Sequence, residues 1–218
     1  MTLAVLRMLD TLFSAAPGEY RPYGGIGSRE TPADICREMN LIGASLYRRG
    51  FMLRSGGAPG ADLAFEKDVP ADGKEIFLPW RGFNGSSSTL YPVGLTDAAI
   101  EAEACRLSPS FDPSKMLDFD GAAATPLELA GRAMLIAQHF HPAWDRCSPA
   151  AKKLHARNVP QILGRTLDKP SRFTVCYTQD GRASGGTGQA LRICIELEVP
   201  ILNLHHPLVR SQVLSRLR

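Results

Sequence analysis

Residues 54–62 read Arg54-Ser55-Gly56-Gly57-Ala58-Pro59-Gly60-Ala61-Asp62, and this stretch decides the fold class. It follows the apolar run Phe51-Met52-Leu53 and precedes Leu63-Ala64-Phe65, which places it at a strand-to-helix turn. Glycines without side chains allow a ligand to approach the backbone closely there. Free N–H groups at the start of the next helix then favour an anion such as a phosphate. The stretch therefore predicts an α/β fold with an anion site at this turn.

Two further glycine turns accompany this one, at residues 24–29 (Gly-Gly-Ile-Gly-Ser-Arg) and 185–188 (Gly-Gly-Thr-Gly). Simple turn geometry explains any one of them. Three such turns at strand ends predict a single phosphate-lined cleft, in which the Arg29 guanidinium adds a bidentate phosphate contact. The predicted ligand-binding residues are Gly25, Gly27, Ser28, Arg29, Arg54, Ser55, Gly56, Gly57, Gly60, Asp62, Gly185, Gly186, Thr187 and Gly188.

Several candidate residues also have a purely structural interpretation. An arginine at a strand end, such as Arg54, is more often an ion-pair partner than a ligand contact. Asp62 either stabilises the start of its helix or accepts a ribose hydroxyl, and Glu66 one turn later more often lies on a solvated helix face. Trp80 and Phe83 either stack on a base or anchor a packed loop. The sequence leaves these alternatives open.

The order of the expected elements predicts one Rossmann-like domain over residues 1–218. Apolar strand segments alternate with helical patterns through short turns, which predicts a parallel sheet with right-handed crossovers, flanked by helices. We expect the core at about residues 20–80 and 170–205, a mainly helical and loop insertion at about 81–165, and a C-terminal helix at about 207–218. The third strand is expected at residues 74–80. Loops of the insertion are expected to select the ligand.

Composition narrows the class of protein. A net charge of +3 and 44% hydrophobic residues are typical of a globular domain, and the charge is too small to indicate a nucleic-acid partner. No segment offers the roughly 18 apolar residues of a membrane span, so we expect no membrane partner. Five cysteines without a Cys-x-x-Cys pair favour reduced thiols and a cytoplasmic location. We also expect a homo-oligomer.

Histidines and a cysteine in the middle of the chain raise the question of a metal site. His139-Phe140-His141, together with Cys147 and His155, includes a His-x-His spacing that suits adjacent zinc ligands. Alternate residues at a helix end point in divergent directions, however, and no Cys-x-x-Cys pair supports the set. We therefore predict no metal site. We also predict no catalytic residue and no cofactor beyond a nucleotide-type ligand.

The motifs at 24–29, 55–62 and 184–188 together resemble the SLOG superfamily, which includes DprA/Smf DNA-processing proteins, YpsA-like proteins and LOG-type phosphoribohydrolases. The likeness is greatest to DprA-like and YpsA-like proteins, including phage-encoded ones, and extends to Glu75-Ile76-Phe77-Leu78-Pro79-Trp80. It covers roughly residues 20–90 and 170–205. The resemblance implies a Rossmann-like sheet that binds nucleotides or nucleotide-derived ligands.

Members of this superfamily differ in function, so the resemblance leaves three hypotheses. The first is a protein that binds or senses a small-molecule nucleotide ligand. The second is a DprA-like mediator that binds single-stranded DNA, and the third is a LOG-type nucleotide N-glycosidase. LOG enzymes carry a catalytic Glu in Pro-Gly-Gly-x-Gly-Thr-x-x-Glu, and Arg192 stands at that position here. A cation does not stabilise a developing oxocarbenium ion, which favours binding over hydrolysis.

Overall fold

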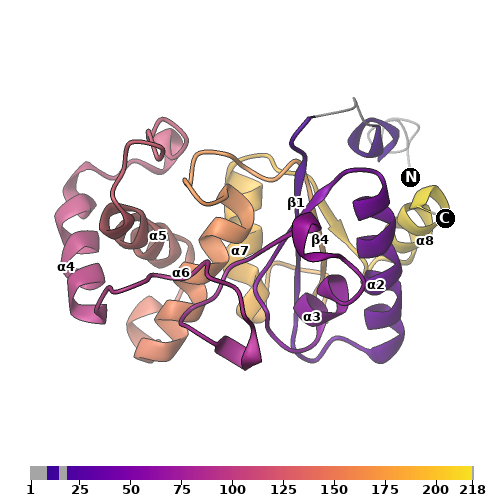
Figure 1. The fold of residues 1–218 in the computed structure, drawn as a ribbon, viewed down its shortest axis with the longest axis horizontal. Coiled ribbons are helices and arrows are strands. Elements are labelled where there is room, and N and C mark those ends of the chain that lie inside the picture. The colour runs from indigo at the N-terminus through magenta and orange to yellow at the C-terminus, as the bar shows by residue number, and fades with distance from the viewer. Residues whose placement is uncertain (1–8, 15–18, 218) are drawn as a thin grey trace.

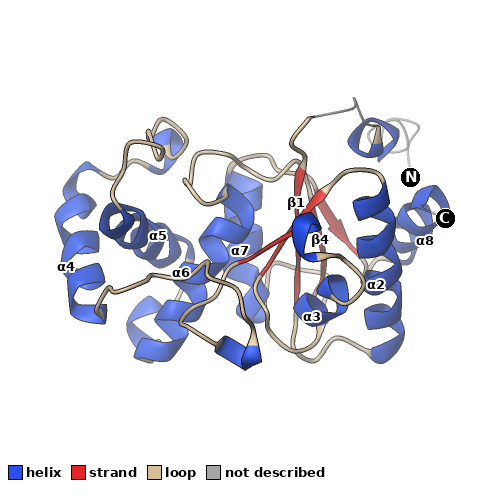
Figure 2. Cartoon of the chain, viewed as in Figure 1, coloured by secondary structure: helices blue, strands red, loops and turns tan. Residues whose placement is uncertain are grey.

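The computed structural model describes residues 9–14 and 19–217, and a five-stranded parallel sheet lies at its centre (Figures 1 and 2). The strand order is β3-β2-β1-β4-β5, and every neighbouring pair is parallel. This arrangement confirms the predicted Rossmann-like parallel sheet flanked by helices. The strands are β1 (Pro22–Gly27), β2 (Met52–Ser55), β3 (Lys74–Ile76), β4 (Thr174–Tyr177) and β5 (Ile201–Asn203).

Helices connect the strands and cover both faces of the sheet. None of the helices in the described part of the chain is long and apolar enough to cross a membrane. The expected C-terminal helix is present, although its last residue, Arg218, lies outside the described residues. The main helices are α2 (Ala33–Arg48), α3 (Ala61–Glu66), α4 (Asp97–Leu107), α5 (Pro126–Phe140), α6 (Pro149–Leu163), α7 (Gly185–Glu196) and α8 (Pro207–Leu217).

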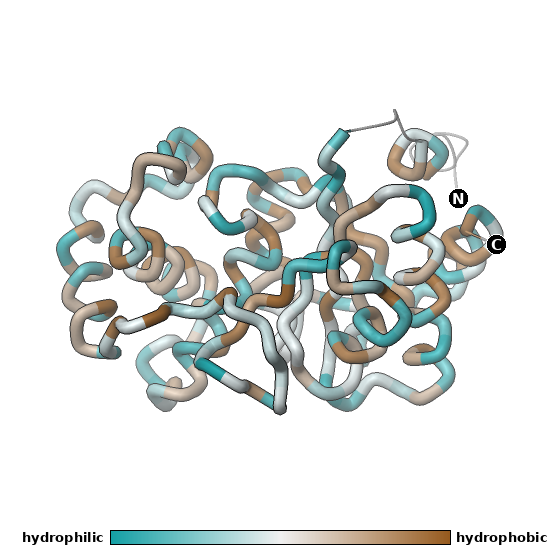
Figure 3. The backbone as a smooth tube through the Cα atoms, viewed as in Figure 1, coloured by the Kyte–Doolittle hydropathy of each residue, from teal (hydrophilic) through white to brown (hydrophobic). Residues whose placement is uncertain are grey.

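Side chains that alternate along the strands form a separate hydrophobic core on each face. Tyr23 of β1 stacks on Phe173, with ring centroids 5.7 Å apart, in the core beneath α2, α3 and α8. Ile26 of the same strand belongs to the opposite core, with Cys176 of β4 and Ile162 of α6. The covering helices carry hydrophobic and hydrophilic residues along the same turns, as amphipathic helices do (Figure 3). The two cores hold the sheet between two helical layers.

The middle of the chain forms a helical lobe beside the sheet, on the left in Figure 1. In this lobe α4 packs on α5, and α5 packs on α6. A reciprocal capping box explains why α5 begins at Pro126: the Thr125 hydroxyl accepts the Glu128 N–H at 3.2 Å, and the Glu128 carboxylate accepts the Thr125 N–H at 2.8 Å. The last helix of the expected insertion, α6, also contacts β1 and β2. It is therefore part of the layer on the sheet.

The third strand is shorter than the sequence predicts, because β3 ends at Ile76 instead of Trp80. The chain leaves the sheet at Phe77, which forms an isolated parallel bridge with Leu90. The Leu78 N–H then donates to the Leu90 carbonyl at 2.8 Å, so the following loop closes back on itself. The Phe77 N–H still donates to the Ser55 carbonyl of β2 at 2.9 Å, so the loop takes over the backbone hydrogen bonding from Leu78 onward.

Candidate functional site

The candidate site is a cavity of about 520 Å³ at the carboxyl ends of β1 and β4, called the site cavity below. These neighbouring strands lead away from each other in the sheet, β1 towards β2 and β4 towards β5. Parallel α/β sheets bind ligands in the crevice at such a switch point. Ser28 follows β1 and Thr178 follows β4, and both line the cavity. Residues of α6 and α7 form its other walls.

The amino terminus of α7 opens onto the site cavity. Ser184 precedes the helix without making a side-chain cap, and the first turn holds no acidic residue. A Cβ atom built on Gly185 or Gly186 would meet nothing within 4 Å, so the backbone at both glycines borders open space. The uncapped N–H groups and the helix dipole favour a negatively charged group there. Thr187 lines the same part of the cavity, as the sequence predicts.

The turn after β1 contributes the opposite rim of the site cavity. Gly27 approaches the neighbouring chain closely, because an added Cβ would lie 2.6 Å from the Ala61 Cβ. The Ser28 carbonyl accepts the Ala61 N–H at 3.2 Å, while the Ser28 hydroxyl accepts the Glu30 N–H at 3.1 Å. Arg29 is exposed at the cavity, and the described residues provide it with no ion-pair partner. Its guanidinium is therefore available to a ligand.

The glycine turn at 56–60 does not form the anion site that the sequence predicts. The Gly57 N–H donates to Glu66 Oε1 at 2.9 Å, and the Ala58 N–H donates to Asp62 Oδ2 at 3.3 Å. Carboxylates of the following helix thus occupy the donors that an anion would need. Gly60, at φ +82°, is required for a different reason: an added Cβ would lie 2.5 Å from the Ser28 carbonyl oxygen. The turn holds the loops together and contributes Ala58 and Asp62 to the cavity wall.

Asp62 belongs to a buried polar group that links α3 to α6. Arg157 Nη1 lies 3.1 Å from Asp62 Oδ2 and donates to Gln161 Oε1, also at 3.1 Å. The guanidinium occupies the space beside Gly56, where an added Cβ would lie 1.3 Å from Nη1. Arg157 Nε and Gln161 Nε2 are buried without a hydrogen-bond partner in the structure. Both residues line the site cavity, but these two nitrogens are themselves buried, and Gln161 Nε2 lies beside Gly56, 2.8 Å from the position of an added Cβ.

Burial changes the protonation of the two carboxyl groups on α3. Burial raises the pKa of Asp62, and the adjacent Arg157 guanidinium opposes this shift. Burial and the charge of Asp62 raise the pKa of Glu66 to about 7. Each carboxyl accepts an N–H of the glycine turn, so the turn holds the pair close together. Glu66 therefore titrates near neutral pH.

Arg54 and Ser55 lie away from the site cavity, contrary to their predicted role as ligand residues. The Arg54 side chain is 1% exposed and pairs with Glu75 at 3.1 Å. Its Nη1 also donates to the Lys169 carbonyl at 2.7 Å. Ser55 is fully buried. Arg54 lies within β2, paired with Gly24 of β1, and its side chain is buried on one face of the sheet.

Two predicted glycines are structural. A Cβ on Gly25 would lie 2.6 Å from Leu53 Cδ1, and one on Gly188 would lie 2.5 Å from the Ala183 carbonyl oxygen. Neither residue lines the site cavity. Arg192 is also absent from the lining and holds the chain together instead. Its Nε donates to the Phe140 carbonyl at 2.6 Å and its Nη1 to the Ala183 carbonyl at 2.9 Å.

The wall formed by α6 is the part of the site that the sequence reasoning missed. Arg157, Asn158 and Gln161 line the cavity although they lie in the segment assigned to an insertion. The sequence contained a signal for this wall: polar residues, His155 among them, recur among apolar ones at helical spacing, a pattern that indicates a helix with one polar face. Burial and the charges of His141, Arg157 and Arg192 lower the pKa of His155 to about 4. The His155 imidazole is consequently neutral at neutral pH.

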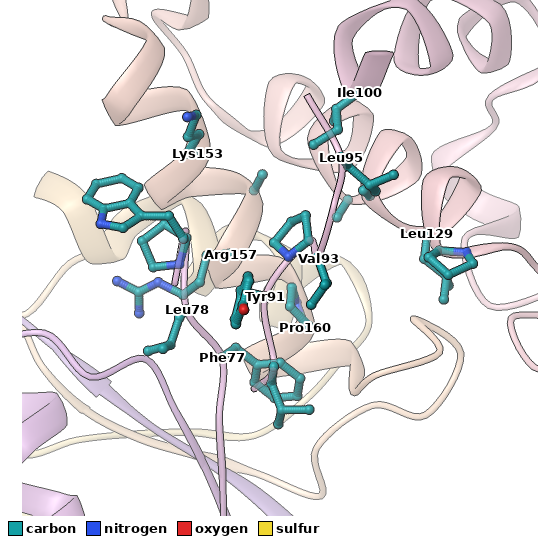
Figure 4. A pocket seen from close by; sticks show the side chains of 18 of the residues that line it. Phe77, Leu78, Tyr91, Val93, Leu95, Ile100, Leu129, Lys153, Arg157 and Pro160 are labelled. Carbon is teal, nitrogen blue, oxygen red and sulfur yellow. The ribbon is translucent and has the colours of Figure 1, made fainter. Parts of the chain in front are cut away.

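A second cavity, also of about 520 Å³, lies between the loop after β3 and helices α5 and α6. Figure 4 shows its largely apolar lining, including Phe77, Tyr91 and Leu129. Trp80 lies in this lining and not in that of the site cavity, which favours the packed loop anchor over base stacking, the two alternatives that the sequence leaves open. Its ring meets that of Phe83 edge to face, with centroids 5.1 Å apart. Arg157 lines both cavities and forms part of the wall between them.

Comparison of the chain with models of known protein families, with curated proteins and with solved structures finds no match.

Proposed function

We propose that the protein binds a nucleotide or a nucleotide-derived small molecule in the site cavity, with a phosphate at the amino terminus of α7. The observation that carries this proposal is the uncapped start of a 12-residue helix, with Gly185 and Gly186 facing open space at the β1–β4 switch point. Backbone N–H groups and the helix dipole bind phosphate in this geometry. Arg29 places an unpaired guanidinium on the same cavity for a second phosphate contact.

The remaining walls of the site cavity suit the polar parts of a nucleotide. Gln161 lines the cavity, but it is 1% exposed and its amide nitrogen is buried, so base and ribose contacts fall to the more accessible groups. The Asp62 carboxylate offers an acceptor for a ribose hydroxyl, in keeping with one of its sequence interpretations. Asn158 and Gln179 add exposed or half-buried amides to the lining. A volume of about 520 Å³ lies within the range of about 300–1,000 Å³ typical of small-molecule sites.

Calorimetric titration tests whether a phosphate is needed for binding. We expect nucleoside mono- or diphosphates to bind and the matching nucleosides to bind much more weakly, because the nucleosides lack the group that α7 recognises. Binding of nucleosides as tightly as their phosphates would contradict the proposed orientation. A screen in which no nucleotide binds the folded protein would contradict the proposal as a whole.

A matched pair of variants at Gly186 tests the place of the phosphate. Gly186→Asn and Gly186→Asp introduce side chains of almost equal size into open space, and only the second is charged. Two like unit charges about 4 Å apart repel each other by about 4 kcal/mol at an effective dielectric constant of 20. We therefore expect Gly186→Asp to weaken nucleotide binding at least 100-fold, as an order-of-magnitude minimum. The Asn variant should stay within a few-fold of wild type.

Nucleotide N-glycosidase activity is the second candidate function, and Asp62 is the observation that favours it. Although Arg192 does not line the site cavity, Asp62 places a carboxylate there, where it is suited to stabilise an oxocarbenium ion. Incubation with nucleoside monophosphates followed by chromatography of released base tests this activity. Base release that is lost in Asp62→Asn would support it. If nucleoside monophosphates bind stoichiometrically and no base is released, the N-glycosidase hypothesis is contradicted and nucleotide binding remains the proposed function.

A further inference from the structure

Three metal-ligating side chains meet beside the site cavity. His141 and Cys147 come from the segment between α5 and α6, and His155 comes from α6. One ligand atom from each residue lies within 4.8 Å of the other two, and no other such group of His, Cys, Asp and Glu occurs in the described residues. The sequence predicts divergent side chains because His139 and His141 flank a helix end. The structure instead pairs His141 with residues from the next turn and helix.

The separation of Cys147 and His141 matches that of two ligands on one zinc ion. Cys147 Sγ lies 3.7 Å from His141 Nδ1 and 3.8 Å from His141 Nε2. Zinc bonds of about 2.3 Å to sulfur and 2.0–2.1 Å to nitrogen in a tetrahedron place these two ligand atoms about 3.6 Å apart. The His141 and His155 rings are close as well, with centroids 4.2 Å apart. The three ligand atoms lie within 4.8 Å of one another, so the cluster has to contract for all three to bind one ion.

The internal hydrogen bonds of the cluster leave it incompletely satisfied. His155 Nδ1 is buried and has no hydrogen-bond partner in the structure. The Cys147 thiol donates to the Ala143 carbonyl at 3.6 Å, and the Ala143 N–H donates to His141 Nδ1 at 3.2 Å. A thiol is a weak donor, and a buried nitrogen without a hydrogen-bond partner is unfavourable. A metal ion would use the thiolate and both imidazole lone pairs.

We propose that His141, Cys147 and His155 form a Zn²⁺ site. One thiolate and two imidazoles select zinc over the oxygen-seeking Mg²⁺ and Ca²⁺. Since no fourth side chain of these types joins the cluster among the described residues, a water molecule completes the tetrahedron. Three protein ligands with one open position are typical of reactive zinc sites, whereas structural sites have four. His155 also lines the site cavity, so the ion lies at its wall.

Titration of the full-length, metal-free protein with Co²⁺ and then Zn²⁺ tests this site. We expect one equivalent of Co²⁺ to bind with a thiolate-to-metal charge-transfer band and the visible bands of tetrahedral cobalt, and Zn²⁺ to displace it. Cys147→Ser should abolish the charge-transfer band. His155→Gln should keep that band, and each variant should weaken binding by at least about 100-fold, since even supporting residues contribute 10–100-fold. Cys105→Ser is the matched control, because Cys105 is exposed and outside the cluster.

Alkylation of the wild-type protein provides a test that does not depend on the folding of variants. Zn²⁺ should protect Cys147 from alkylation while leaving the exposed Cys105 reactive, as mapped by mass spectrometry. Gly186→Asp should still bind the metal, because that variant disturbs only the proposed phosphate contact. The proposal is overturned if the wild type binds no stoichiometric metal. It is also overturned if Cys147 stays unprotected, or if Cys147→Ser and His155→Gln bind as tightly as wild type.

Discussion

The pH dependence of stability tests whether the Glu66 carboxyl is buried against the glycine turn at 56–60. Its pKa rises from 4.5 to about 7 because the side chain is buried and lies beside the charge of Asp62. A carboxyl whose pKa is raised on folding binds its proton more tightly in the folded state. The stability that it contributes is therefore present below the unfolded pKa and is lost as the pH rises through the folded value. Glu66→Gln keeps an acceptor for the Gly57 N–H and removes the titration.

The linkage relation gives the size of the effect. With pKa values of 4.5 unfolded and about 7 folded, Glu66 costs the wild type about 0.8 kcal/mol at pH 5 and about 3.3 kcal/mol at pH 8. Between these pH values the wild type should therefore lose about 2.5 kcal/mol more stability than Glu66→Gln. For a chain of this size, that difference corresponds to a shift of about 5–10 °C in Tm.

Urea denaturation of both proteins from pH 5 to pH 8 measures this difference directly. Asp62 is present in both proteins, so the comparison reports Glu66 and its coupling to Asp62. Glu101→Gln is a suitable control, because Glu101 is an exposed carboxylate on α4 and should leave the pH dependence of the wild type unchanged. Parallel stability curves for the wild type and Glu66→Gln would refute the reasoning.

Three other outcomes follow from the geometry. Arg54→Met should lower the free energy of unfolding by about 1–3 kcal/mol in urea, because the Lys169 carbonyl loses its donor and Glu75 keeps only Arg165 as an ion-pair partner; a ligand role would instead show as lost nucleotide affinity. Gly56→Ala should cost about 1–3 kcal/mol in the same assay and weaken nucleotide binding, because its Cβ displaces the Arg157 guanidinium; an unchanged affinity would contradict this. Oligonucleotide binding measured by fluorescence anisotropy between 50 and 200 mM salt should show a shallow slope, as few phosphate contacts are available; a loss of about 10³-fold or more would favour the single-stranded DNA mediator.

The sheet was predictable because its signals are local. Alternating strands and helices, short turns and glycines at strand ends depend on neighbouring residues, and they specify a parallel sheet through crossover geometry. The glycine segments at 24–29 and 185–188 were only partly placed: residues 24–27 lie inside β1, and residues 185–188 form the first turn of α7 instead of a turn at the end of β4. The predicted end of β3 was wrong. Phe77 pairs with Leu90 of the following loop, and the apolar pattern of 74–80 contains no information about that pairing.

The sequence by itself determined the parallel sheet and which segments were candidates for an anion site. Only the tertiary structure decided which turn remains open. Asp62 and Glu66 fill the donors of the 56–60 turn, whereas the glycines at the start of α7 keep open space before them. The tertiary structure also places α6 at the cavity wall and His155 close to Cys147. The reason is physical: backbone propensity is set by adjacent residues, but hydrogen-bond donors and lone pairs are satisfied by whichever groups the fold places within reach.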